Sequence, residues 1–251
     1  PVKHSGSYNN TGEADVILLA IFDESEQNCR ILALNRDTIA QVPMLGLGGK
    51  FAGTHPEQLA LSHTYGSGLE DSCENTKKAV SDFLKGIRID HYLAMNLDAV
   101  SILNDAVGGV TVEISEELSK ADPSLQPGRQ TLQGEKALHF VQIRKNVGGQ
   151  LNLERMERQK LYMQGFLEAW QKKAADGTFV LETYERAAPY LVTDCSVELL
   201  STLSTRFADY SLWEIVTPEG ENVLEDQYYA FYADEKKLQE MILRLFYAPK
   251  K

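Results

Sequence analysis

Short apolar runs alternate with amphipathic stretches along most of this chain, and that alternation constrains its fold most strongly. The run VILLAIF at residues 16–22 is apolar at every position, which is typical of a central strand covered by helices on both faces. RILALN at 30–35 predicts the neighbouring strand, and 72–86 predicts an amphipathic helix with Ser72 as its cap and Gly86 as its stop. Strands that alternate with helices indicate a three-layer α-β-α fold of the α/β class. We predict one domain over residues 1–251.

The rest of the chain continues the same pattern. We expect further strands at 91–97, 110–114, 137–144, 212–218 and 227–233. We expect further helices at 98–108, 153–174, 178–188, 196–208 and 235–247.

The charge and the cysteine pattern exclude several functions. A net charge of −11 argues against nucleic-acid binding, which needs a broad cationic surface. No run of 18 apolar residues occurs, so we expect no membrane-spanning segment within the sequence. The three cysteines and five histidines are scattered, which predicts neither a disulfide framework nor a zinc site.

One stretch of this acidic chain is basic. Residues 139–160 carry five lysines and arginines against two acids. On the strand expected at 137–144, Gln142 and Arg144 would project from the same face. Asn152 is a candidate cap of the next helix, and Arg155 and Gln159 lie one turn apart near its start, where the helix dipole favours anions. This pattern fits a phosphate site, and it also fits a solvated basic turn.

A second candidate site lies at the end of the strand predicted at 30–35. Arg36 and Asp37 follow that strand, the usual place for ligand groups in an open α/β sheet. The alternative is a local ion pair between the two side chains.

Five segments in order resemble the LytR-CpsA-Psr family. They are LNRDT at 34–38, HTYGSG at 63–68, the stretch 86–114, TLQGEKALHFVQIRK at 131–145 and ERMERQ at 154–159. The resemblance is strongest over residues 14–170. It implies an α/β domain with a mixed central sheet on the extracytoplasmic face of a bacterial membrane. A membrane anchor and a first strand would then precede residue 1.

The resemblance also implies an activity and a site. Family members bind polyprenyl phosphates or diphosphates and transfer the linked glycopolymer to peptidoglycan, in cell-wall or capsule assembly. By motif position, Arg36 would grip the lipid phosphates and Asp37 would act on the acceptor hydroxyl. Asp15 would help to hold magnesium. The remaining phosphate-binding positions would be Gln142, Arg144, Arg155 and Gln159.

Several positions depart from the family pattern. The family has arginine, arginine and aspartate at the positions of Glu13, Gln142 and Asn152. Asp15 would be the sole carboxylate ligand, and one carboxylate holds magnesium only weakly. The main hypothesis is therefore a phosphotransferase, and the alternative is a non-catalytic lipid-phosphate or cell-wall binding protein. A third hypothesis, a DNA-binding regulator, is disfavoured by the charge.

Overall fold

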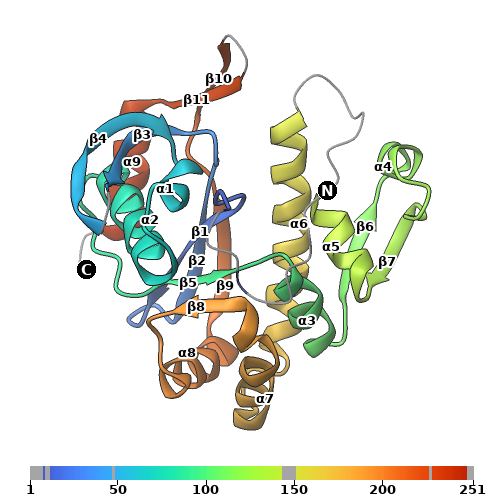
Figure 1. The fold of residues 1–251 in the computed structure, drawn as a ribbon. Coiled ribbons are helices and arrows are strands. Elements are labelled where there is room, and N and C mark those ends of the chain that lie inside the picture. The colour runs from blue at the N-terminus through green and yellow to red at the C-terminus, as the bar shows by residue number, and fades with distance from the viewer. Residues whose placement is uncertain (1–7, 9–11, 47–48, 143–150, 226–227, 248–251) are drawn as a thin grey trace.

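The computed structural model describes residue 8 and residues 12–46, 49–142, 151–225 and 228–247 (Figure 1). The strands are β1 (Ile17–Asp23), β2 (Asn28–Leu34), β3 (Ile39–Leu45), β4 (Phe51–Gln58), β5 (Leu93–Met95), β6 (Val110–Ile114), β7 (Gly128–Leu132), β8 (Leu191–Thr193), β9 (Ser211–Val216), β10 (Gly220–Glu225) and β11 (Tyr228–Ala233). The helices are α1 (Leu61–Thr64), α2 (Leu69–Phe83), α3 (Asp98–Ala106), α4 (Glu116–Ala121), α5 (Glu135–Gln142), α6 (Leu151–Gln171), α7 (Gly177–Ala187), the 3₁₀ turn η2 (Ala188–Tyr190), α8 (Val197–Asp209) and α9 (Glu235–Phe246).

The central sheet has the order β1-β2-β9 and is mixed, as expected. β1 pairs antiparallel with β2, so that Ile17 faces Leu34, whereas β9 runs parallel to β2. Every residue of β2 is buried, but alternate residues of β1 are exposed. The expectation that 16–22 forms the covered central strand was therefore wrong. β1 lies at the edge, and β2 is the strand covered on both faces.

Helices cover both faces of β2, which confirms the three-layer α-β-α arrangement. Leu32 and Leu34 pack into a cluster with residues of α2 and α9, including Val80 and Leu238. On the opposite face, Cys29 and Ile31 pack against residues of α6 and α8, namely Leu167, Trp170 and Phe207. This alternation follows from the two-residue repeat of a strand.

A second apolar cluster forms on the other side of α6. Tyr162 of α6 is buried there together with residues of β6, β7, α5 and α7, and Phe166 packs against this cluster. Helix α6 thus separates the two parts of the molecule (Figure 1). Apolar side chains of α6 point to both sides of the helix, because one side packs on the central sheet and the other packs in the second cluster.

Residues 137–142 belong to helix α5, so the strand predicted at 137–144 was wrong. The buried residues Ala137, Phe140 and Val141 follow a spacing of three and four, which is helical. Gln142 therefore does not lie on a strand, and the prediction that it shares one strand face with Arg144 was wrong. Arg144 lies outside the described residues.

The predicted helix starts also need correction. Helix α2 begins after Gly68, whose backbone N–H donates to the Ser72 Oγ over 3.1 Å, so Ser72 lies within the helix rather than capping it. Gly86 ends this segment as expected, at a φ of 87°. Helix α6 begins at Leu151, which places Asn152 inside it instead of at its cap.

Most of the other predicted elements were confirmed within a few residues, but the hairpin β3–β4 and the short elements α1, α4, β7, β8 and β10 were not anticipated. Within the described part of the chain, no helix combines the length and apolar character needed to cross a membrane. The assignment of residues 1–251 to one domain stays a prediction.

Candidate functional site

A tight turn after β2 positions Arg36 and Asp37. The Asn35 side chain accepts a hydrogen bond from the Asp37 N–H at 2.9 Å, and the Thr38 hydroxyl donates to the Asn35 carbonyl at 2.6 Å. The carbonyl of Arg36 accepts the N–H of Ala60, and that of Asp37 accepts the N–H of Phe231, each at 2.9 Å. This turn is thus held by segments distant in sequence, so its two charged side chains start from a fixed backbone.

The Arg36 guanidinium is surrounded by carboxylates. Its Nη1 donates to Asp15 and its Nη2 to Glu13, while its Nε lies 3.5 Å from Asp37 Oδ1. Its side chain is only 11% exposed. Burial by itself lowers the pKa of Arg36, but the hydrogen bond to Glu13 and the charges of the three carboxylates outweigh it and raise the pKa. The guanidinium therefore stays charged at any physiological pH.

Antiparallel pairing explains why Asp15 and Arg36 meet. Since Ile17 faces Leu34, the residues two before β1 and two after β2 emerge at the same end of the sheet. Arg155 enters this end from the first turns of α6, and its Nη1 lies 3.9 Å from Asp15 Oδ1. Its side chain is 8% exposed, so a second nearly buried cation faces the same carboxylate.

The other predicted positions have different outcomes. The Gln159 amide donates to the Val141 carbonyl at 3.2 Å and so joins α6 to α5. Gln142 is the partly buried last residue of α5. No contact of either residue with Arg36 is resolved among the described residues. The phosphate-binding assignments of Gln142, Arg144 and Gln159 stay predictions.

Gln58, the last residue of β4, is a further residue at this site that the sequence did not indicate. Its amide Nε2 lies 3.4 Å from Asp37 Oδ1 and donates to the Tyr229 carbonyl at 2.8 Å. The amide thereby orients the Asp37 carboxylate. No local signal marks this residue, because its contact depends on the unpredicted hairpin that brings β4 back to the turn after β2.

An apolar strip extends from this site along the edge strand. Leu18, Ala20 and Phe22, the β1 strip, point to the side of the sheet on which α6 and α8 pack, because they pair with Ala33, Ile31 and Cys29 of β2. Leu18 is 39% exposed and Phe22 36%. The strip runs about 13 Å from its Leu18 end, which is nearest Arg36, at the usual rise of ~3.3 Å per residue.

The described residues do not fit a preformed magnesium site. Mg²⁺ needs several oxygen ligands around a common point, usually including one or two carboxylates. Here the carboxylates of Glu13 and Asp15 are both directed at the Arg36 guanidinium, and Arg155 approaches Asp15 as well. The two guanidinium groups thus lie beside the carboxylate oxygens that would have to coordinate a metal ion. The assignment of Asp15 as a magnesium ligand stays a prediction.

Comparison with known sequences identifies relatives along nearly the whole chain. The profile of the LytR_cpsA_psr family matches residues 3–246. The polyisoprenyl-teichoic acid–peptidoglycan teichoic acid transferase TagU of Oceanobacillus iheyensis is 25% identical over 202 residues, which cover 78% of this chain and 58% of the relative. The TagU of Halalkalibacterium halodurans is 29% identical over 54% of this chain and 40% of the relative. The chain thus spans about half the length of these curated relatives.

Solved structures share the fold. TagT bound to LI-WTA superposes with a TM-score of 0.75 at 22% identity, covering 95% of this chain and 86% of TagT. The LytR-CPS2A-psr family protein YwtF (TagT) with bound octaprenyl pyrophosphate lipid gives a TM-score of 0.71 at 21% identity, with the same coverage. At these identities the likeness establishes the architecture of the chain.

Proposed function

Because this chain belongs to the LytR-CpsA-Psr family, we propose that it transfers a polyprenyl-diphosphate-linked glycopolymer onto peptidoglycan in the cell envelope. The TagU relatives carry a teichoic acid transferase name, and one TagT structure holds octaprenyl pyrophosphate. The observation that carries the proposal is Arg36, a nearly buried guanidinium at a strand end, with Arg155 close by and an apolar strip beside it. An extracytoplasmic location and a membrane anchor are part of the same proposal.

The lipid diphosphate would bind to Arg36 and Arg155. Arginine holds phosphate oxygens through two parallel hydrogen bonds, and a buried arginine does so in a low dielectric. Glu13 is the most exposed of the three carboxylates around Arg36, with 47% of its side chain accessible against 40% for Asp15 and 12% for Asp37, so a phosphate would displace it most easily. Arg144, Gln142 and Gln159 are included as further phosphate contacts.

The polyprenyl tail would lie along the β1 strip. An extended isoprenoid chain needs apolar surface that starts at the diphosphate site and continues away from it. Leu18 begins such a surface at the end of β1 nearest Arg36, and Phe22 ends it next to Tyr210, with ring centroids 6.4 Å apart. Burying this exposed surface under lipid would contribute roughly 25 cal/mol per Å² to binding.

In the proposed transfer, a peptidoglycan hydroxyl attacks the phosphorus that bears the sugar. A new oxygen–phosphorus bond forms, the bond from that phosphorus to the bridging oxygen breaks, and polyprenyl phosphate leaves with the electron pair. Asp37 would accept the proton of the hydroxyl. Arg36 and Arg155 would stabilise the charge that spreads over the phosphoryl oxygens.

One observation favours a second candidate function, a non-catalytic lipid-phosphate receptor. Glu13 and Asp15 already engage Arg36, and the described carboxylates do not form a magnesium site. A protein of this kind would bind the lipid and release no product. A DNA-binding regulator remains disfavoured by the net charge of −11.

The test is release of polyprenyl phosphate from a polyprenyl-diphosphate-linked glycan in the presence of peptidoglycan. We expect release by the wild-type protein and its loss in Arg36→Ala. Arg88→Ala is the matched control, because the Arg88 side chain is 88% exposed and pairs with Asp90. Lipid binding without release would support the receptor function, and neither binding nor release would overturn both.

A further inference from the structure

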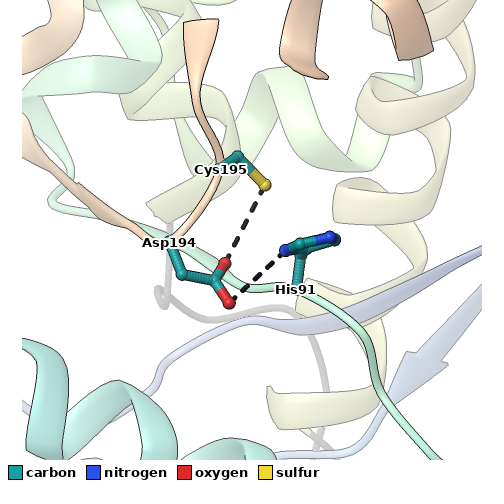
Figure 2. Close-up of side chains that lie close together, drawn as sticks. All are labelled: His91, Asp194 and Cys195. Carbon is teal, nitrogen blue, oxygen red and sulfur yellow. Dashed lines mark hydrogen bonds and ion pairs between the residues drawn. The ribbon is translucent and has the colours of Figure 1, made fainter. Parts of the chain in front are cut away.

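Three side chains from two distant segments of the chain meet at the β5–β8 ladder (Figure 2). His91 precedes β5, whereas Asp194 and Cys195 follow β8, more than a hundred residues later. One ligand atom from each lies within 4.8 Å of the other two. The ladder itself causes this meeting, because antiparallel pairing of Leu93 with Thr193 places the residues before β5 beside those after β8.

We propose that His91, Asp194 and Cys195 bind a divalent transition-metal ion of the zinc class. The His91 Nδ1 lies 3.5 Å from Asp194 Oδ2, and Cys195 Sγ lies 3.9 Å from Asp194 Oδ1. Zinc bonds of about 2.0–2.3 Å in tetrahedral geometry place neighbouring ligand atoms roughly 3.3–3.7 Å apart. Small side-chain rotations therefore bring three protein ligands to one ion and leave the fourth position for water.

Neighbouring residues hold the carboxylate of Asp194 in its position. Asp194 Oδ1 accepts the Tyr92 N–H at 2.8 Å, which orients the carboxylate toward the ladder. Lys77 Nζ lies 3.9 Å from Asp194 Oδ2 and opposes a cation there, but it also pairs with Glu74 at 2.7 Å. When a metal ion binds, Lys77 can keep Glu74 as its partner and release Asp194.

The ligand types determine which ion would bind. A thiolate and an imidazole favour zinc, cobalt or nickel, whereas magnesium prefers oxygen ligands alone. The site is thus distinct in chemistry from the magnesium role implied for Asp15. Its ion would tie the segment before β5 to the segment after β8, where β8 leads into the Ser196 cap of α8. Because the three ligands meet only in the folded chain, binding of the ion should stabilise the folded state.

Calorimetric titration of the metal-free protein with Zn²⁺ tests the site directly. We expect one ion per chain, a rise in Tm on binding, and no comparable binding of Mg²⁺. Removal of even an outer partner of a metal ligand costs about 10- to 100-fold in affinity, so His91→Gln, Asp194→Asn and Cys195→Ser should each weaken binding at least tenfold. Asp194→Asn keeps an acceptor for the Tyr92 N–H and so separates metal loss from misfolding.

Two controls complete the experiment. His55→Gln removes an exposed histidine from β4 and should leave zinc binding unchanged. Bound Co²⁺ should show thiolate-to-metal charge-transfer absorption in the wild type and lose it in Cys195→Ser. Zinc binding that survives all three ligand variants, or no zinc binding by the wild type, would overturn the proposal. Polyprenyl diphosphate binding, measured on the same variants, should not change, so failure here is distinguishable from failure of the proposed transferase function.

Discussion

Glu13 accepts a hydrogen bond from Nη2 of Arg36 and so takes one of the positions that a phosphate oxygen would need. Asp15 occupies Nη1 of the same guanidinium. Two carboxylates of the chain thus engage the guanidinium that we propose for the lipid diphosphate. In that proposal, ligand binding would exchange a carboxylate for a phosphate, and Glu13, the more exposed of the two, would be the carboxylate displaced.

Removing the Glu13 charge should strengthen diphosphate binding. For Glu13→Gln we expect a gain of about 1.4- to fivefold, the equivalent of the ~0.2–1 kcal/mol typical of an exposed ion pair. The gain should shrink at high salt. Glu26→Gln is the control, because Glu26 lies in the turn at the opposite end of β1 and β2. Weaker binding by Glu13→Gln would mean that Glu13 supports the ligand instead of competing with it.

The geometry of Arg155 should matter as much as its charge. Arg155→Lys keeps the positive charge but loses the planar guanidinium, so we expect diphosphate affinity to fall about 10- to 100-fold, in line with ~1.5–3 kcal/mol for a hydrogen bond to a charged group. Arg88→Lys, at an exposed position, should bind like the wild type. Equal affinities of the Arg155→Lys and wild-type proteins would remove Arg155 from the site.

The β1 strip should contribute to binding affinity only for ligands that carry an isoprenoid tail. Leu18→Ser and Phe22→Ser should each weaken binding of geranylgeranyl diphosphate at least fivefold, since each removes ~1 kcal/mol or more of apolar contact. Binding of inorganic diphosphate should stay the same. Val223→Ser, an exposed apolar residue on β10, serves as the control. If the strip variants weakened the binding of both ligands equally, the loss of affinity would come from misfolding or from a change in the diphosphate site, and the strip would not be the tail-binding surface.

Magnesium should not bind measurably to the ligand-free protein through Asp15. Its carboxylate is held by Arg36 and approached by Arg155, which repel a dication. Titration with Mg²⁺ in the absence of lipid should give no heat that differs between the wild type and Asp15→Asn. A saturable magnesium site that Asp15→Asn abolishes would show that the two arginines move away from this carboxylate.

The buried thiols predict a decline of stability at alkaline pH. Burial raises the pKa of Cys29 to about 11, and burial is also the main reason that the pKa of Cys73 is raised to about 11. Their usual value is 9.0, so the unfolded chain releases these protons at lower pH than the folded one. This contribution to stability is full below pH 9 and is lost as pH rises towards 11. Urea unfolding of Cys29→Ala between these values should show a smaller decline than the wild type.

The residue pattern indicated Arg36, which follows the strand confirmed as β2, and Arg155, which lies near the start of the helix confirmed as α6. Asp15, which meets both at the same end of the sheet, was indicated by the family resemblance alone. The errors arose where a short apolar run allowed two interpretations. Residues 137–142 are helical because their apolar side chains face the second core, and β1 is an edge strand although it is apolar from Ile17 to Phe22.

Other features depend on tertiary contacts that one sequence does not reveal. Gln58 reaches Asp37 only because the β3–β4 hairpin returns to the turn after β2. His91 meets Asp194 and Cys195 through the β5–β8 ladder, so the spacing of histidines and cysteines along the sequence did not predict this cluster. The pairing of Glu13 with Arg36 likewise joins residues on different segments.

A titration of geranylgeranyl diphosphate into the wild-type protein, Arg36→Ala and Arg88→Ala tests most directly whether Arg36 binds the diphosphate. We expect saturable binding to the wild type and Arg88→Ala, and a loss of at least tenfold in Arg36→Ala, because a buried charged hydrogen-bond donor contributes ~1.5–3 kcal/mol. Equal binding by all three proteins, with Arg36→Ala folded, would contradict the assignment of Arg36 as the diphosphate-binding residue.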